Sequence, residues 1–571
     1  MDETDRADTD AAEAGAAVER SSAAGPSADD LLARFDYLNE VGAALSREKD
    51  IDRLLESILI AAKRIARADG GTLYRVSDDR RSLRFEILRT DSLGIAMGGS
   101  TGVAVPFPPI PLYGEGGEPN THNVAACAVL QDRTVAIDDA YTASGFDFSG
   151  TRKFDKTTGY RSQSFLTVPM KNHEDEIIGV LQLINARDPG STRVRAFTDT
   201  DRRLAESLAS QAAVVLTNRL LISHLENLFE SFINLINSAI DDKSPYTGGH
   251  CERVPVLTMM LADAACAATD GPLAAFSMNE QQRYELKIAG LLHDCGKVTT
   301  PVHVVDKATK LETIFDRIHL IDTRFEVVRR TIEVDLLRER LDAMRRGERA
   351  NQVELEAELR RRERELADDR DFLRKVNVGG EFMTPEDQAR VRSIAQRWQW
   401  RDGDGFDKPL LTADEINNLT IARGTLTAEE RSVINHHIEV TIQMLEALPW
   451  PKHLKNVPEF AGGHHERMDG KGYPRGLRGD QMSVQARVMA IADVFEALTA
   501  KDRPYKPGKR LTEALTILGR MAQSGHVDPD LFRVFVREKV YLRYAEAFLD
   551  AEQIDAVDES QIPGYAEAGA A

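Results

Sequence analysis

Histidine and aspartate residues gather between positions 250 and 493 of this chain in a pattern typical of metal chemistry. Seven of them stand out by their surroundings: His250, His293, Asp294, His437, His464, His465 and Asp493. A single histidine is more often an ordinary core or surface residue than a ligand, and a His-Asp dipeptide recurs by chance. Asp493 is different, because it lies within an apolar run where an ionised carboxylate must pair with a cation or a metal.

Together these residues indicate one kind of chemistry. Imidazoles and carboxylates in this proportion suit Mn, Fe, Zn or Co better than Mg or Ca, which prefer all-oxygen ligands. Seven ligands exceed the need of one ion, whereas a shared aspartate can bridge two ions about 3.5–4 Å apart. Such a pair activates water and stabilises the attacking and leaving oxygens of a phosphoryl displacement. Lys297, three residues after Asp294, can neutralise a phosphate oxygen.

The sequence around several of these residues predicts helices. Thr427-Ala428-Glu429-Glu430 is a Thr-x-x-Glu capping sequence, so a helix should begin there and carry His436 and His437. Asp493 sits inside the apolar helical stretch 488–495. The sequence therefore predicts that helices from distant parts of the chain bring the seven residues together.

A longer signature connects these positions. It consists of His293-Asp294-x-Gly296-Lys297, His437, His464-His465-Glu466-Arg467-x-Asp469-Gly470-x-Gly472-Tyr473-Pro474, Asp493 and Asp502-Arg503-Pro504-Tyr505-Lys506. Residues 223 to about 550 therefore resemble an HD-GYP domain, a bacterial variant of the HD phosphohydrolase superfamily. The resemblance implies an all-α fold, a metal-dependent phosphodiesterase, and cyclic di-GMP as substrate, with the linear dinucleotide as product and further hydrolysis to GMP left open.

The resemblance also implies roles for individual residues. Asp294 would bridge two divalent metal ions, Mn or Fe first and Zn or Co as alternatives, and Lys297 would assist catalysis. The implied metal ligands are His293 and Asp493 on one ion and His437, His464 and His465 on the other, with His250 at the family's early histidine position. Arg503 and Lys506 would bind substrate phosphate, and Tyr473 would shape the loop beside the pocket. His436 is interpreted as a bystander, since the family's apolar pattern follows His437.

Three positions depart from the family pattern. Tyr246 stands where some members carry a glutamate that helps to hold a third metal, so we expect two ions. Cys295 and Met468 replace the usual aliphatic and bulky residues, which we interpret as packing changes.

The first half of the chain indicates an α+β domain with an antiparallel sheet. Helical spacing near residues 31–59 is followed by strand-like runs at Gly71–Val76, Leu83–Leu88, Thr134–Ile137, Gln163–Val168 and Ile177–Ile184, and then by a long helical pattern from about Thr198. We interpret Pro169–Asn172 as the hairpin connection between the last two strands. The stretches 167–172 and 177–185, with Phe197 and Asp201, resemble a GAF domain over about residues 30–222.

Two functions for the GAF-like region stay open. GAF domains that bind cyclic nucleotides often carry a pattern that Asn185, Phe197 and Asp201 match here, but Ala186 and Arg202 break it. The region is therefore either a cyclic-nucleotide sensor or, as these departures favour, a sensory or dimerising domain with another ligand or none.

The predicted organisation has six parts: a disordered acidic tail at 1–28, a GAF sensor domain at 29–222, the first part of the HD-GYP domain at 223–316, a charged helical insertion at 317–423, the second part at 424–550, and a C-terminal tail at 551–571. In the insertion, 15 of the 30 residues 351–380 are charged with both signs interleaved, which is typical of a solvated helical hairpin. A partner-docking role for this arm is an alternative.

A heptad-like stripe crosses the boundary between the two predicted domains. Its members are Leu208, Ala212, Val215, Ile222, Phe229, Ile233 and Ile236. Either the stripe forms a parallel dimer helix that transmits a signal, or its two halves pack on their own domains. We expect a homodimer.

The charge and cysteine content of the chain limit which binding partners and which cellular compartment we expect. With 73 Lys and Arg against 92 Asp and Glu, the net charge is −19, which disfavours DNA, RNA and membrane surfaces as partners. Four scattered cysteines, no basic signal region and no apolar run of membrane length favour a cytoplasmic protein. Besides cyclic di-GMP hydrolysis, two alternatives remain: hydrolysis of another cyclic dinucleotide, and a non-hydrolysing cyclic-dinucleotide receptor.

Overall fold

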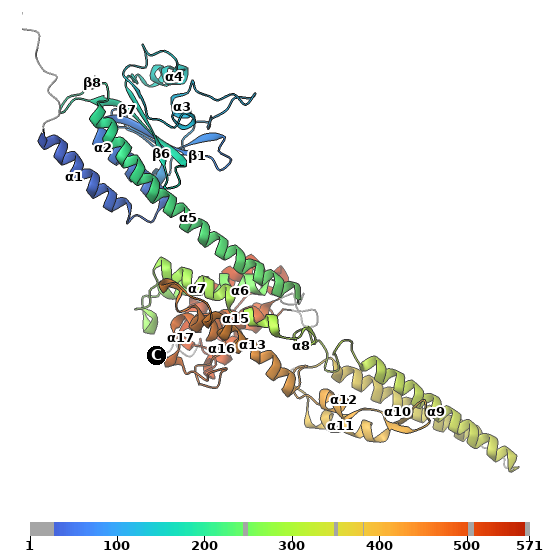
Figure 1. Ribbon diagram of the computed structural model, residues 1–571. Coiled ribbons are helices and arrows are strands. Elements are labelled where there is room, and N and C mark those ends of the chain that lie inside the picture. The colour runs from blue at the N-terminus through green and yellow to red at the C-terminus, as the bar shows by residue number, and fades with distance from the viewer. Residues whose placement is uncertain (1–27, 244–248, 348–351, 381, 501–507, 566–571) are drawn as a thin grey trace, which may run out of the picture. The chain divides into compact units, whose positions relative to one another are not determined.

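The structure is a computed structural model that describes residues 28–243, 249–347, 352–380, 382–500 and 508–565 (Figure 1). The chain divides into two compact units, one up to Leu228 and one from Phe229 onward. The predicted acidic tail up to residue 27 lies outside the described residues, as do Tyr246, Arg503 and Lys506.

The first unit is an α+β domain. Its helices are α1 (Ala28–Leu45), α2 (Ile51–Ala66), α3 (Val124–Leu130), α4 (Ser149–Thr158) and the first part of α5 (Asp199–Lys243). Its strands are β1 (Ala68–Val76), β2 (Ser82–Thr90), β3 (Ile95–Gly98), β4 (Ile110–Pro111), β5 (Val135–Ile137), β6 (Phe165–Lys171), β7 (Ile177–Arg187) and β8 (Val194–Arg195).

The strands form an antiparallel sheet in the order β3-β2-β1-β7-β6-β5, with β4 beside β2 and β8 beside β7. The predicted sheet is thereby confirmed, but the proposed hairpin connection is wrong. Pro169 and Met170 lie inside β6, paired with Val180 and Gly179 of β7, and the turn begins at Asn172. Strand β5 pairs only with Phe165–Thr167 of β6, so Pro169, which has no N–H group, lies beyond that pairing.

Helices cover both faces of this sheet (Figure 1). On one face, α1, α2 and α5 pack on the sheet through a cluster that includes Leu54, Ile58, Leu73 and Leu208. Helix α2 begins at Asp50, whose side chain accepts a hydrogen bond from the Arg53 amide, and its apolar residues recur on one side. Helices α3 and α4 lie on the opposite face.

The second unit is mainly helical. Around one core it contains α6 (His250–Cys266), α7 (Glu280–Leu292), α8 (Val302–Val305), α13 (Ala428–Glu446), α14 (Val457–Gly462), α15 (Val484–Thr499), α16 (Leu511–Gln523), α17 (Pro529–Arg537) and α18 (Val540–Phe548). A short 3-10 helix, η3, spans Cys295–Thr299. The predicted capping box at Thr427 and Glu430 starts α13, as expected. Residues 551–565 pack on the same core, where Ile562 is buried.

The heptad-like stripe predicted from the sequence lies on the long helix α5, and its residues pack in two different cores. Leu208 and Ala212 are buried in the core of the first unit, and Ile233 is buried in the core of the second. Phe229 and Ile236 lie half-buried against that second core, whereas Ile222 is exposed. The stripe is therefore used mostly within the chain, as the second of the two interpretations proposed.

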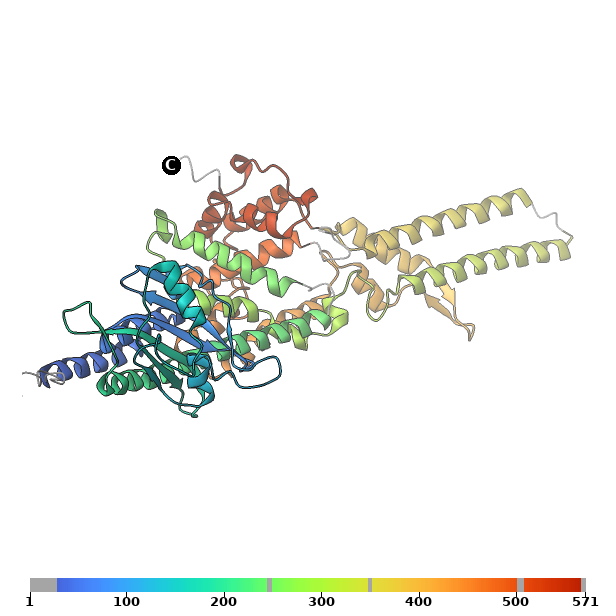
Figure 2. The ribbon, with the colours of Figure 1, turned by 90° about the horizontal axis from the view of Figure 1, so that it is seen from above.

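The insertion forms a module with its own core. It consists of α9 (Ile318–Arg345), α10 (Gln352–Asn377), α11 (Pro385–Arg397), α12 (Ala413–Leu419) and a small hairpin of β9 (Gln399–Arg401) and β10 (Asp407–Pro409). Helices α9 and α10 run side by side as an extended hairpin (Figure 2). The β9–β10 hairpin is a departure from the expected all-helical insertion.

The two ends of the insertion are tied together. The Thr425 hydroxyl donates to the Lys307 carbonyl oxygen at 2.9 Å, and the buried Lys307 ammonium contacts Glu430 at 2.7 Å. Lys310 is also buried, and its ammonium donates to the carbonyl oxygens of Leu419 and Ile421 at 3.1 and 2.8 Å. Burial lowers the pKa of Lys310 to about 8.

In the described parts of the chain, no helix is long and apolar enough to cross a bilayer. The four cysteines are free, and three of them are buried.

Candidate metal centre

Three histidines in the second unit are oriented by the same local contact. His293 at the end of α7, His437 within α13 and His464 after α14 each lie against the carbonyl oxygen three residues earlier, at 2.7, 2.5 and 2.6 Å from Nδ1. A carbonyl oxygen only accepts hydrogen bonds, so Nδ1 carries the proton in each ring. Each Nε2 therefore presents a lone pair, which is the form of imidazole that binds a metal.

Asp294 lies among these nitrogen atoms. Its Oδ1 is 3.3 Å from His437 Nε2, and its Oδ2 is 3.2 Å from His293 Nε2 and 2.6 Å from the ammonium of Lys297. The carboxylate is buried, and the lysine holds only one of its two oxygens. Asp294 is thus placed between two groups of histidines, as the sequence predicted for a bridging ligand.

His250, the first residue of α6, completes one of these groups. Its Nε2 lies 3.2 Å from Asp294 Oδ2, 3.3 Å from Asp493 Oδ1 on α15 and 3.3 Å from His293 Nε2. On the other side of the ring, Nδ1 lies 2.5 Å from the buried carboxylate of Glu496. A carboxylate behind a histidine fixes the orientation of the ring and raises its basicity as a ligand.

His465 completes the other group. Its Nε2 is 3.2 Å from His437 Nε2, and its ring stacks on Tyr473 with centroids 4.9 Å apart. The structure therefore brings all seven sequence-predicted ligands into one centre. His436, interpreted as a bystander, is exposed and pairs with Glu439.

The charges of this centre follow from its burial and its neighbours. Desolvation lowers the pKa of His464 to about 4, and it also lowers the pKa of His465, so both rings are neutral near pH 7. Burial opposes ionisation of Asp294, but Lys297 and His293 hold the pKa of this carboxyl well below its usual range. Burial likewise opposes the charge of Lys297, but Asp294 raises the pKa of Lys297 to about 12.

The donor set fits a divalent transition metal. Asp294 Oδ1 and His464 Nε2 are buried and have no hydrogen-bond partner among the described residues, which costs free energy unless a cation satisfies them. The close approach of His437 Nε2 to Asp294 Oδ1 at 3.3 Å brings two lone pairs together, which also calls for a positive charge between them. Two groups of ligand atoms each fall within 4.8 Å: Asp294, His437, His464 and His465, and His250, His293 and Asp294.

Two glycines of the signature allow the chain to approach these ligands. A Cβ atom at Gly296 would lie 2.0 Å from the carbonyl oxygen of His437, so only glycine lets η3 pack against α13. A Cβ atom at Gly472 would lie 2.5 Å from the backbone of Glu466. The buried Glu466 side chain in turn accepts hydrogen bonds from the Arg475 and Leu477 amides, which fixes the loop that carries Tyr473.

Sequence reasoning missed Glu496 and its partner Arg253. Arg253 Nε donates to Glu496 at 2.8 Å, so this carboxylate joins an arginine to the His250 ring. Glu496 lies one helical turn after Asp493 in the same apolar helix. The argument that singled out Asp493, a carboxylate among apolar residues, applies equally to Glu496 and would have found it.

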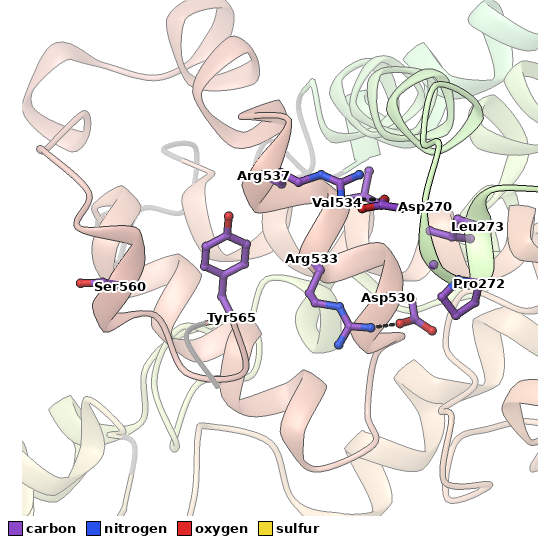
Figure 3. Close-up of a pocket in the computed structure, with 10 residues that line it drawn as sticks. Asp270, Pro272, Leu273, Asp530, Arg533, Val534, Arg537, Ser560 and Tyr565 are labelled. Carbon is purple, nitrogen blue, oxygen red and sulfur yellow. Dashed lines mark hydrogen bonds and ion pairs between the residues drawn. The ribbon is translucent and has the colours of Figure 1, made fainter. Parts of the chain in front are cut away.

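A separate cavity of about 510 Å³ in the second unit lies beside α17 (Figure 3). Two arginines line it, but Arg533 pairs with Asp530 and Arg537 pairs with Asp270 at 2.9 Å. Since both guanidinium groups already have carboxylate partners, the cavity is a poor candidate for binding an anion. None of its lining residues belongs to the metal centre.

The first unit holds another cavity of about 510 Å³, beside the sheet and bounded by α3 and α4. Its lining is rich in aromatic side chains and, among the described residues, contains no Lys or Arg: Tyr74, Phe85, Phe107, Phe148, Phe154, Tyr160 and Phe165 are its aromatic members. Asn185 and Asp201 have structural contacts instead: Asn185 accepts from the Gln163 amide, and Asp201 pairs with Arg34 and Arg195.

Comparison with known protein families finds a match for each of the two units. Residues 50–216 match the GAF domain family, residues 247–368 match the HD domain family, and residues 387–531 match a second HD domain family. The chain carries a GAF domain and an HD domain. The first HD match contains His250, His293 and Asp294, and the second contains the other four candidate ligands, so the matched segments meet at the metal centre.

Curated relatives match parts of the chain. A 3′3′-cGAMP-specific phosphodiesterase of Vibrio cholerae is 48% identical over 81 residues, which are 14% of this chain and 19% of that protein. A cyclic di-GMP phosphodiesterase of Pseudomonas aeruginosa is 42% identical over 115 residues, 20% of this chain and 26% of that protein. A cyclic di-GMP phosphodiesterase of Thermotoga maritima is 37% identical over 112 residues, 19% and 30% of the two chains. The chain therefore spans less than a third of the length of these relatives.

Among solved structures, the GAF domain of an Acinetobacter phosphoenolpyruvate-protein phosphotransferase matches 33% of this chain and 96% of its own, with 12% identity and a TM-score of 0.24. The GAF domain of the corresponding Coxiella burnetii protein matches 35% and 99%, with 9% identity and a TM-score of 0.25.

Proposed function

We propose that this protein is a metal-dependent phosphodiesterase of the HD-GYP type that hydrolyses cyclic di-GMP to the linear dinucleotide. The observation that carries the proposal is the centre itself, where neutral imidazole nitrogens and a buried aspartate converge beside a lysine that stays protonated. Water would add to one phosphorus atom, the bond from phosphorus to the 3′ oxygen would break, and a proton would pass to that oxygen. The products of this step are a 5′-phosphate and a 3′-hydroxyl group.

Two divalent ions, Mn or Fe first and Zn or Co as alternatives, suit the two ligand groups. One ion would be held by Asp294, His437, His464 and His465, and the other by His250, His293, Asp294 and Asp493. Bound there, the ions would activate water and neutralise charge that develops on the phosphate.

The protein's own groups prepare the site for this reaction. The backbone carbonyl contacts of the histidines fix their tautomers before any ligand arrives, so little reorganisation is needed. The Lys297 ammonium, held by Asp294, can attract a phosphate oxygen at neutral pH. The Tyr473 ring, stacked on His465, can bound the substrate pocket, and Arg503 and Lys506 would add phosphate contacts.

The decisive experiment compares Asp294→Asn with the full chain loaded with Mn or Fe(II). We expect turnover of cyclic di-GMP by the wild type and a loss of at least about 100-fold in the variant, because removal of a ligand charge disrupts both ions. His436→Ala is the matched control, since that exposed histidine is adjacent to His437 but points its contacts to Glu439. Unchanged turnover in Asp294→Asn would refute the metal mechanism.

The second substrate to test is 3′3′-cGAMP, because one of the similar relatives is named for it. Both cyclic dinucleotides present the same phosphodiester groups to the metal centre, so side-by-side rates decide the base preference. Binding of either compound without hydrolysis would favour a receptor instead.

We propose further that the GAF domain regulates this activity through a small-molecule ligand in its aromatic cavity. The cavity's lack of Lys and Arg supports a ligand with little negative charge, because a phosphate there would find only His122 as a potential cation and would also meet the Asp147 carboxylate. We therefore expect cyclic AMP and cyclic GMP to leave turnover unchanged, and a change of several-fold with either would refute this choice of ligand.

The protein is also proposed to act as a homodimer in the cytoplasm. The four free cysteines support a reducing compartment, since none forms a disulfide.

A further inference from the structure

The aromatic cavity of the GAF domain has an acidic side chain in its lining. Asp147 is exposed and is the sole Asp or Glu among the described residues that line the cavity, which include no Lys or Arg. Its carboxylate accepts hydrogen bonds from the Ser149 amide at 2.8 Å and from the Ser149 hydroxyl at 3.0 Å. These bonds lower the pKa of Asp147, so the carboxyl group is ionised near neutral pH.

Two basic residues lie near Asp147, but in the described part of the chain neither forms an ion pair with it. His122 lines the cavity, and its Nδ1 lies 3.4 Å from the Gly145 carbonyl oxygen. Arg152 on α4 does not line the cavity, and its guanidinium group lies over Tyr141, 5.9 Å from the ring centroid. The negative charge of Asp147 can therefore attract a cation that enters the cavity.

The seven aromatic rings of the cavity have no Lys or Arg over them among the described residues. Elsewhere in the same domain such contacts occur, since Arg64 lies over Tyr37 at 4.0 Å from the ring centroid. Neighbouring rings of the cavity are tilted rather than stacked, because Phe85 meets Tyr74 at 55° and Phe107 at 51°. Ring faces that no parallel ring covers can receive a cation.

The two tyrosines of the lining present hydrogen-bond acceptors to the cavity. The Tyr74 hydroxyl donates to Gln182 Oε1 at 3.1 Å, and the Tyr160 hydroxyl donates to Asp69 at 2.6 Å. Burial raises the pKa of both phenols, so neither loses its proton near neutral pH. Since each proton is already donated within the protein, each hydroxyl oxygen can only accept from a ligand, which suits the N–H groups of an amine.

We propose that the GAF cavity binds an organic cation, either an amine or a quaternary ammonium compound, with its charged nitrogen between the aromatic rings and Asp147. The inference rests on the proposed regulation through this cavity and states the chemical class of the ligand. Aromatic faces attract ammonium groups, and a carboxylate beside them supplies the opposite charge. The cavity volume of about 510 Å³ falls within the range of roughly 300–1,000 Å³ that is typical of small-molecule sites.

The first test uses pairs of ligands that match in shape and differ in charge. Choline and 3,3-dimethyl-1-butanol form one pair, because the quaternary nitrogen of the first is replaced by carbon in the second. Benzylamine and benzyl alcohol form the other pair, with an ammonium group against a hydroxyl group. Each compound is titrated into the full chain by isothermal titration calorimetry. We expect the cation of at least one pair to bind at least about 10-fold more tightly than its neutral partner.

The second test repeats these titrations on variants of the lining. Asp147→Asn removes the charge and keeps an oxygen for the Ser149 amide, so the preference for the cation should fall by at least about 5-fold. Asp175→Asn is the matched control, since Asp175 is exposed outside the lining, between β6 and β7. Phe107→Leu removes an aromatic face at a side chain that is 38% exposed. It should weaken the cation several-fold and its neutral partner by less than about 2-fold.

The outcomes separate the charge of the ligand from the role of the domain, because the binding measurement does not depend on hydrolysis. The cation site would be refuted by equal affinities within both pairs, by no binding of any of the four compounds, or by a cation preference that survives Asp147→Asn. A bound cation that leaves cyclic di-GMP turnover unchanged would refute regulation through this cavity and leave the cation site standing. A preference lost in Asp147→Asn and kept in Asp175→Asn is the result that we expect.

Discussion

Replacing Glu496 by glutamine tests how the metal centre orients its first histidine. The wild-type carboxylate receives three contacts, one from His250 at 2.5 Å and two from Arg253 at 2.8 and 2.7 Å. Glutamine keeps the size of the side chain but has only one acceptor oxygen and adds an amide group that donates. One of the two neighbours, His250 or Arg253, must therefore lose its acceptor in a buried place.

The expected loss of metal affinity follows from the one hydrogen bond that glutamine cannot replace. Leaving one donor to a charged partner unsatisfied costs about 1.5–3 kcal/mol, which is a factor of roughly 10–100 in a binding constant. The same range is typical of changes in the partner behind a metal-bound histidine. We expect the dissociation constant of the ion on the His250 side to rise by this factor in Glu496→Gln. The second ion, which we propose Asp294, His437, His464 and His465 to hold, should bind as before.

The assay is a metal titration of the full chain against a competing chelator, with bound metal counted by elemental analysis. Glu439→Gln is the matched control, because it makes the same change in an exposed His–Glu pair, where His436 and Glu439 are 2.8 Å apart. We expect the control to bind both ions like the wild type. Two ions bound with wild-type affinity in Glu496→Gln would refute the argument that this carboxylate positions His250.

Three further predictions follow from contacts described above. Gly296→Ala should abolish metal binding and destabilise the HD domain by at least about 1–3 kcal/mol, because the new Cβ meets the His437 carbonyl; retention of bound metal in elemental analysis would contradict this. The pKa of Lys310 falls from 10.5 to about 8 on folding, so between pH 8 and 10.5 the unfolded chain binds more protons than the folded chain. The free energy of unfolding should therefore rise with pH across this range, by as much as about 3 kcal/mol. Urea unfolding at pH 7.5 and 10, followed by tryptophan fluorescence, should show this rise in the wild type and not in Lys310→Met. Removing metal with a chelator should lower the melting temperature of the wild type by several degrees and leave Asp294→Asn unchanged, since only bound ligands stabilise the folded state; equal shifts would argue against the centre.

That the seven candidate ligands lie together could be predicted from the sequence, because the family motif links them and a carboxylate within an apolar helix, such as Asp493, needs a cation nearby. That they bind metal stays a prediction. All seven candidate ligands meet, and Asp493 was indicated by burial energetics before any fold was known. Glu496 obeys the same rule, yet no motif drew attention to it. A residue that orients a metal-binding histidine contacts the side of the imidazole ring that faces away from the metal. The sequence does not show which residue lies on that side.

Packing partners were harder to predict. Helix α5 holds two interleaved apolar stripes, and spacing cannot rank them, because each satisfies a helical repeat. The stripe through Leu208 and Ile233 packs within the chain, while the one through Leu228 stays exposed. The prediction that Pro169 lies in a hairpin connection was wrong for a related reason. Proline usually interrupts a strand, and it is tolerated only where no neighbouring strand needs a hydrogen bond from its nitrogen.

The contact between Thr425 and Lys307 has a consequence for how the HD domain folds. Asp294 and His437 are separated by about 140 residues, and closing so long a flexible loop is entropically costly. If residues 308–424 fold first around their own core, their joined ends shorten the effective loop to about 26 residues, which saves about 1.5 kcal/mol by the (3/2)RT ln n relation. The insertion then acts as a single link in the chain, so its length does not slow assembly of the metal centre. We expect a short glycine-serine linker in place of 308–424 to leave the refolding rate of the remaining domain within a few-fold, and a much faster rate in stopped-flow refolding would contradict this order of events.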